Sequence, residues 1–152
     1  QLLAVKKNYD AIKYIKEPYE SVQEEAVKIN YRALRYISSP TFKVQLIAIK
    51  NDEKAITFID ELDKEKMLAF LKENILVIKY IVRKITKEYL EEVLKEVLSK
   101  EDVDEKYVRD FLNCSIIDRN SDTMQMDKVM FIYKYGSKKA KRIAVDEKLK
   151  MI

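Results

Sequence analysis

The sequence contains no histidine, and only one glycine and one cysteine among 152 residues. Without histidine, the chain lacks the usual general base, the usual triad partner and the commonest metal ligand. A single glycine is too few for a glycine-rich phosphate loop, and Cys114 has no histidine to activate its thiol. We therefore predict a protein that is not an enzyme and that has no cofactor or metal.

The lone Cys114 excludes an internal disulfide, which favours a reducing compartment. We expect its side chain to be a small buried apolar group. Even the apolar stretch of residues 74–82, "NILVIKYIV", is interrupted by Lys79, so no membrane span is expected. No secretory signal is visible, and the prediction is a cytoplasmic protein.

Scarce glycine and proline, with rich lysine, glutamate, leucine and isoleucine, leave little material for hairpin turns and predict an all-α fold. Within it, one phrase occurs four times. The copies are "AVKKNYDAIKYI" from Ala4, "AVKINYRALRYI" from Ala26, "AIKNDEKAITFI" from Ala48 and "FLKENILVIKYI" from Phe70, each 22 residues after the last. A fixed period of roughly 20 to 50 residues is the signature of a stacked array. We predict an α-solenoid of four 22-residue helix pairs over residues 1–88, and a degenerate repeat with a C-terminal helical cap over residues 89–152.

Each copy is predicted to hold two short helices, the second about two turns long and partly 3₁₀. An asparagine or aspartate stands between them, where its side-chain oxygen can cap the second helix. The members of this column are Asn8, Asn30, Asp52 and Asn74. Pro18 and Pro40 mark the joints between copies. Because such short helices are marginal alone, we expect the aliphatic columns to form a core between copies, with some tyrosines at the surface.

The AVKxNxxAIxYI phrase resembles the short helical repeats of a domain-of-unknown-function family in bacterial and bacteriophage proteins, joined by linkers of the "SPTFKVQ" kind. It is also similar in size to leucine-rich-variant repeats, which alternate an α-helix with a 3₁₀ helix. Copies three and four depart from the pattern, with Leu62 and Lys84 in place of proline and Phe70 in place of alanine. The resemblance implies an array fold and assigns no activity. A binding scaffold of this kind is compatible with a bacterial or phage protein that acts on a host partner.

The N-terminal copy has Leu2 and Leu3 where a terminal cap should be polar. We expect that further repeats precede Gln1, or that this end packs against a second copy of the chain in a homo-oligomer. After residue 88 the phrase decays into amphipathic helices expected at about 88–99, 103–116, 124–135 and 138–149, with Gly136 as a stop. Net charge alternates in three blocks: +5 for residues 1–87, −6 for 88–123 and +5 for 124–152.

Two basic clusters are candidate binding surfaces. The first is a lysine column with flanking cations: Lys6, Lys28, Lys50, Lys72, Lys13, Arg35 and Lys79. It can track phosphates, or it can be a solvated face that keeps the array soluble. The second lies in "YKYGSKKAKR" and comprises Tyr133, Tyr135, Lys138, Lys139, Lys141 and Arg142. Its aromatic rings and cations suit stacking on bases, or the segment folds back on the acidic block.

"DRNSDT", residues 118–123, opens like a calcium loop, but Thr123 and Val129 occupy the positions of the required glycine and glutamate. A polar turn in which Asp118 or Ser121 caps a helix is favoured. Two functions are then compatible with the sequence. The leading prediction is a binding scaffold that offers its repeat surface to another protein, and the alternative is a nucleic-acid binder that uses the two basic clusters.

Overall fold

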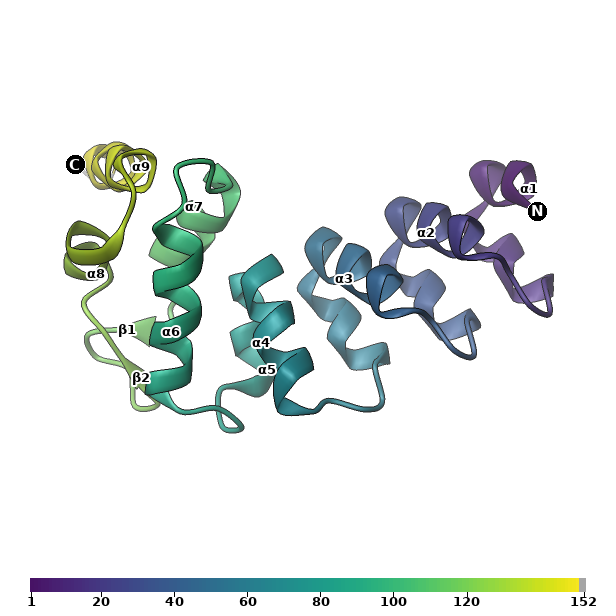
Figure 1. The fold of residues 1–152 in the computed structure, drawn as a ribbon, viewed down its shortest axis with the longest axis horizontal. Helices are drawn as coiled ribbons and strands as arrows, with labels where there is room; N and C mark the ends of the chain where they lie inside the picture. The colour runs from purple at the N-terminus through teal and green to yellow at the C-terminus, as the bar shows by residue number, and fades with distance from the viewer. Residues whose placement is uncertain (151–152) are drawn as a thin grey trace. The chain divides into compact units, whose positions relative to one another are not determined.

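The computed structural model describes residues 1–150 and confirms the all-α prediction (Figure 1). The chain divides into two compact units, Gln1–Val77 and a second that begins at Ile78. The sequence placed its boundary at residue 88, whereas the compact units meet inside the fourth copy of the phrase. The predicted cap, residues 89–152, extends two residues beyond the described range.

In the first unit, α-helices alternate with 3₁₀ helices. The α-helices are α1 (Leu2–Lys7), α2 (Glu20–Ile29), α3 (Phe42–Asn51) and α4 (Lys64–Glu73). The 3₁₀ helices are η1 (Tyr9–Tyr14), η2 (Tyr31–Tyr36), η3 (Glu53–Phe58) and η4 (Ile75–Val77). The predicted 3₁₀ character of the second helix in each copy is therefore confirmed.

Helices of this unit pack on their neighbours in sequence order. The α-helices contact one another as α1–α2, α2–α3 and α3–α4, and the 3₁₀ helices as η1–η2, η2–η3 and η3–η4 (Figure 1). The aliphatic columns lie between them, as predicted. Fully buried members are Val5, Val27, Ile49 and Leu71 on the α-helices and Ile12 on η1, with Leu34 and Ile56 nearly so on η2 and η3.

The side-chain caps of the 3₁₀ helices are confirmed in three of the four copies. Asn30 accepts a hydrogen bond from the Arg32 N–H at 2.9 Å, and Asp52 accepts one from the Lys54 N–H at 2.9 Å. Asn74 accepts one from the Leu76 N–H at 3.1 Å and also donates to the Ile49 carbonyl at 2.8 Å. Asn74 therefore ties the start of η4 to the end of α3.

The second unit holds five α-helices and one two-stranded pair among its described residues. The α-helices are α5 (Ile78–Ile81), α6 (Lys87–Leu98), α7 (Glu105–Asn113), α8 (Lys128–Tyr135) and α9 (Lys138–Lys150). The strands β1 (Ile117–Asp118) and β2 (Met124–Gln125) pair in parallel. Helices were expected close to α6, α7 and α9, but α8 begins later than the predicted residue 124.

The turn between the strands explains the late start of α8. Ser121 accepts a hydrogen bond from the Met124 N–H at 2.9 Å, and the Asp118 carbonyl accepts one from the Met126 N–H at 3.0 Å. These bonds hold the chain extended up to Asp127, whose carboxylate caps α8 through the Met130 N–H at 3.1 Å. The prediction that Asp118 or Ser121 caps a helix is therefore wrong.

Apolar side chains of α6 to α9 form the core of the second unit. Phe111 and Phe131 meet at an edge with centroids 6.3 Å apart, and Phe131 contacts Tyr135 at 4.9 Å. Cys114 is buried and free, as predicted. Within residues 1–150, no helix combines the length and the apolar character needed to cross a membrane.

Candidate functional site

Cations and aromatic rings alternate along the 3₁₀ helices of the first unit. The Lys13 Nζ lies 5.0 Å from the Tyr14 ring and 5.9 Å from the Tyr36 ring. The Arg35 Cζ lies 5.8 Å from the Tyr36 ring and 5.2 Å from the Phe58 ring. Each cation thus sits between the ring of its own 3₁₀ helix and the ring of the next. We call these five residues the cation–aromatic ladder.

The far side of the ladder is extended by two more residues. The Tyr31 ring lies 6.0 Å from the Phe58 ring, and the Arg32 guanidinium lies 5.0 Å from Tyr31. In the third copy, Thr57 replaces the cation of the column, and its hydroxyl donates to the Lys54 carbonyl at 2.8 Å. Within the first unit the ladder therefore ends at Phe58.

The two cations of the ladder are exposed, and its rings differ in burial. The Tyr14 side chain is 81% exposed, whereas Tyr36 and Phe58 are half-buried. Hydrogen bonding to Tyr14, helped by the charge of Asp10 at 3.7 Å, raises the pKa of the Lys13 ammonium.

The predicted lysine column lies in the last turns of the α-helices, on a different layer from the ladder. Lys6, Lys28, Lys50 and Lys72 are exposed there, at the negative ends of the helix dipoles. A helix-stabilising role accounts for their positions. Lys79 is exposed on α5, in the second unit.

One cavity brings Lys28 of the lysine column close to Tyr31 and Arg32, which extend the ladder. A polar cavity of about 360 Å³ is lined by Lys28, Tyr31, Arg32, Asn51 and their neighbours. The Asn51 amide donates to the Val27 and Lys28 carbonyls at 3.1 and 3.2 Å. This side chain occupies the acceptors at the end of α2. The Asp52 carboxylate, which caps η3 through the Lys54 N–H, lines the same cavity, so Lys28 and Arg32 share it with an acid.

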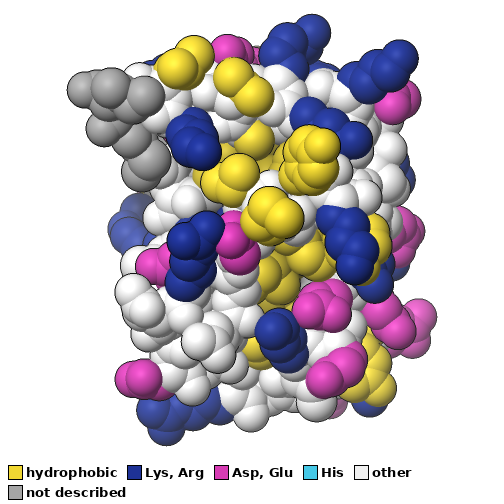
Figure 2. Space-filling view, turned by 90° about the vertical axis from the view of Figure 1, so that its left-hand side faces the viewer, with side chains coloured by type: hydrophobic (Ala, Val, Ile, Leu, Met, Phe, Trp, Pro, Cys, Tyr) yellow, Lys and Arg dark blue, Asp and Glu magenta, His cyan; other side chains and the backbone are white. Residues whose placement is uncertain are grey.

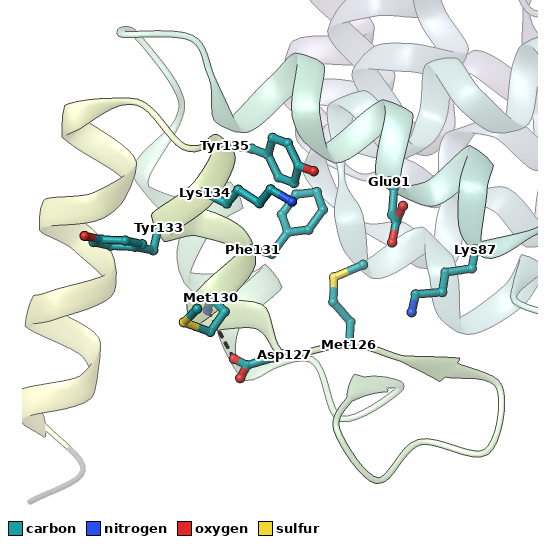
Figure 3. A pocket seen from close by; sticks show the side chains of 9 residues that line it. All are labelled: Lys87, Glu91, Met126, Asp127, Met130, Phe131, Tyr133, Lys134 and Tyr135. Carbon is teal, nitrogen blue, oxygen red and sulfur yellow. Dashed lines mark hydrogen bonds between the residues drawn. The ribbon is translucent and has the colours of Figure 1, made fainter.

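The second predicted cluster is divided between two sides of α8. In Figure 3, Tyr133 and Met130 point to one side of α8, while Lys134, Tyr135 and Phe131 point to the side of α6. The Tyr133 ring lies 6.0 Å from the Lys141 Nζ of α9. Residues 133 and 135 therefore do not form one stacking platform.

Tyr135 lies between two ammonium groups. The Lys95 Nζ is 4.5 Å and the Lys134 Nζ 5.2 Å from its ring centroid. Hydrogen bonding to Lys134, with the added charge of Lys95, lowers the pKa of the phenol. Beside it, a pocket of about 450 Å³ reaches from Lys87 and Glu91 on α6 to residues of α8 (Figure 3).

The basic segment was predicted to fold back on the acidic block, but among the described residues its cations do not make the ion pairs that such folding was expected to form. α9 packs on α7, inside that block, but the acid comes from α9 and the base from α7. Glu147 pairs with Arg109 at 3.1 Å and accepts a bond from Asn113 at 3.3 Å. Among residues 1–150, no carboxylate pairs with Lys138, Lys139, Lys141 or Arg142, which open α9.

The calcium-like "DRNSDT" turn is held by bonds within the chain. Asp118 accepts from the Arg119 N–H at 2.9 Å, and Arg119 in turn pairs with Asp127 at 2.5 Å. Within the described part of the chain, no cluster of three metal-ligating side chains is present.

The site prediction named Lys13 and Arg35 but omitted the rings that hold them, Tyr14, Tyr36 and Phe58. The signal was present, because an aromatic residue stands at the same position in all four copies and directly follows a cation in three of them. The chain matches no protein-family model, no curated protein and no solved structure.

Proposed function

We propose that residues 1–88 form an α-solenoid and that the chain is a non-enzymatic scaffold in the cytoplasm, which binds another protein through the cation–aromatic ladder. The solenoid is supported by the sequential packing of α1 to α4 and η1 to η4, which leaves one continuous face of 3₁₀ helices. The ladder is the observation that carries the binding function.

The ladder has the composition of a protein-binding hot spot. Tyrosine and arginine are enriched among the residues that dominate the energetics of such surfaces. A tyrosine ring offers a large contact area with two rotatable bonds, and the planar guanidinium of arginine stacks on rings and pairs with carboxylates. Here Lys13 and Arg35 are already fixed between rings, so binding costs little additional side-chain entropy. The fitting partner is a segment with carboxylates for the cations and apolar side chains for the rings.

Nucleic acid is the second candidate, and one observation favours it. Cations interleaved with rings can bind phosphates while bases stack on the rings. Against it stand acids in the same unit: Asp10 lies beside Lys13 at 3.7 Å, and Glu24 pairs with Lys43 at 2.8 Å. Such acids weaken the positive field on which phosphate binding depends.

The ladder is tested by affinity capture with the purified chain and three matched variants. Tyr14→Ala and Arg35→Glu change exposed ladder positions, and Lys16→Glu changes an exposed cation in the linker after η1. We expect a protein of the producing cell to be retained by the wild type and by Lys16→Glu, at both 50 and 200 mM salt, and lost with the two ladder variants.

Fluorescence anisotropy with generic RNA and DNA separates the two candidates. If phosphates bind through the lysine column, the affinity for RNA and DNA should fall steeply as salt rises. The triple variant Lys28→Glu/Lys50→Glu/Lys72→Glu should then abolish this binding. Such a result, with no protein lost from the ladder variants, would refute the scaffold. Absent or unchanged nucleic-acid binding would dispose of the alternative.

A further inference from the structure

A groove runs between α8 and α9 in the second unit, well separated in sequence from the ladder. Its floor is formed by Ile132 and Ala144, which are buried, and its walls by Val129, Tyr133 and Val145, which are 40%, 72% and 58% exposed. Figure 2 shows hydrophobic side chains gathered on this side of the molecule, with basic and acidic side chains around them. Single exposed apolar residues are ordinary, but a contiguous patch marks an interaction site.

The groove is built from two helical stripes. Val129, Ile132 and Tyr133 follow i, i+3, i+4 spacing on α8. Ala144 and Val145 occupy the i+3 and i+4 positions after Lys141 on α9, and Lys148 follows at i+7. Its volume of about 280 Å³ is below the roughly 300–1,000 Å³ of small-molecule sites. Such a space suits side chains from a partner's surface.

The charges of the groove are all positive. Lys141 and Lys148 lie two helical turns, about 10 Å, apart on its α9 side, and no described lining residue is acidic. Glu147 directly precedes Lys148, but its carboxylate bonds to Arg109 and Asn113 of α7 and not to the groove. Asp127, near Lys148, is paired with Arg119. The rim therefore presents two cations to whatever lies in the groove.

The basic start of α9 is also unfavourable for the helix itself. Lys138, Lys139, Lys141 and Arg142 lie near its N-terminal end, and the first turn contains no acid. Cations there oppose the helix dipole. Of these four cations only Lys141 lines the groove. Helix stability does not account for its placement, whereas recognition of an anionic partner does.

We infer that the α8–α9 groove binds an acidic amphipathic helix of another protein. Two apolar side chains of that helix, at i+3 and i+4, would enter between Tyr133 and Val145, and glutamates at i and i+7 would pair with Lys141 and Lys148. Charge selects this occupant over a second copy of the chain, because a two-fold contact would bring two cationic rims together. The inference does not depend on the ladder or on the solenoid.

The test uses the full chain and three fluorescein-labelled helical 15-residue peptides. The first carries two glutamates seven residues apart, with leucines three and four residues after the first glutamate. The second has lysines in place of the glutamates, and the third has serines in place of the leucines. Fluorescence anisotropy at 100 mM salt measures each affinity. We expect the second and third peptides to bind at least about tenfold more weakly than the first.

Protein variants supply the matched controls. Val145→Glu changes an exposed groove wall and should weaken binding of the glutamate peptide about tenfold or more, whereas Arg142→Glu changes an exposed cation of α9 outside the groove lining and should leave it within about twofold. The double variant Lys141→Glu/Lys148→Glu should prefer the lysine peptide, which also shows that it is folded.

Several results would overturn the inference. These are equal or absent binding of the glutamate and lysine peptides by the wild type, unchanged affinity of Val145→Glu, or no reversal of preference in the double variant. A 15-nucleotide oligouridine that binds more tightly than the glutamate peptide, or a dimer in sedimentation that Val145→Glu dissociates, would assign the groove to a nucleic acid or to a second copy instead.

Discussion

Two buried glutamines occupy equivalent positions of α2 and α3. Gln23 and Gln45 are each 7% exposed, and within the described chain the Oε1 atom of each has no hydrogen-bond partner. The Gln23 amide donates to the Pro18 carbonyl at 3.0 Å, across the joint between the first two copies. The same position of α4 holds Met67, which is also 7% exposed.

Replacing Gln45 with methionine should therefore stabilise the chain. Gln45→Met removes a buried acceptor that lacks a partner and keeps a long unbranched side chain, so we expect a gain of about 1 kcal/mol in the free energy of unfolding. Gln23→Met is the matched control. It also removes the bond to Pro18, so its gain should be smaller or absent. Urea denaturation followed by circular dichroism measures both, and a loss of stability in Gln45→Met would contradict this account.

At the scale of the element, Gly136 lies between α8 and α9, where the close approach of Ile132 leaves no room for a side chain. Its φ of −74° is open to any residue. A Cβ built on it, however, would lie 2.6 Å from the Ile132 carbonyl oxygen and 2.9 Å from the Ile132 Cγ2. The sequence predicted a stop at this glycine, and the structure shows that the reason is steric.

Gly136→Ala should therefore destabilise the chain by about 1–3 kcal/mol, because the backbone must shift to admit the methyl group. Lys138→Ala, an exposed change two residues away, should stay within about 0.5 kcal/mol of the wild type. Thermal unfolding at matched concentration compares them. Equal stability of the two variants would mean that the α8–α9 joint moves apart at little cost.

The sequence could predict those features that follow from the repeat itself, but not those that depend on distances between copies. The 22-residue period predicted the alternating helices, the caps at Asn30 and Asp52 and the burial of the aliphatic columns. It did not predict the donation from Asn74 to the Ile49 carbonyl, because that bond depends on the distance between two neighbouring copies. The strands at 117–118 and 124–125 were missed because pairs this short leave no periodic pattern.

The ladder was only half predicted, for a reason that lies in 3₁₀ geometry. Side chains three residues apart eclipse in a 3₁₀ helix, so Asp10 and Lys13 meet at 3.7 Å while Ile12 turns to the core. The aromatic residue at position 14 is then directed away from the core, next to the cation of its own copy. The sequence predicted only that some tyrosines would lie at the surface, and not that they would pair with the cations.

At the scale of the whole molecule, the two candidate surfaces differ in what supports them. The ladder needs several copies, because each cation lies between rings of two successive 3₁₀ helices. The α8–α9 groove needs only two helices, which Ser137 ties to α6 through the Leu98 carbonyl at 2.8 Å. Damage to the N-terminal end of the first unit should therefore harm the ladder first.

The proposed solenoid makes that expectation measurable. In an array, each copy is stabilised mainly by its neighbours. Ile12 and Ile56 occupy equivalent buried positions of η1 and η3, and replacing either with alanine should cost about 2–5 kcal/mol locally. Ile12→Ala should lower amide-exchange protection in α1, η1 and, less strongly, α2, and leave α4 unchanged. Ile56→Ala should lower protection on both sides of η3. Hydrogen exchange read by mass spectrometry resolves these segments, and an equal loss of protection across residues 1–77 in both variants would show one cooperative core in place of an array.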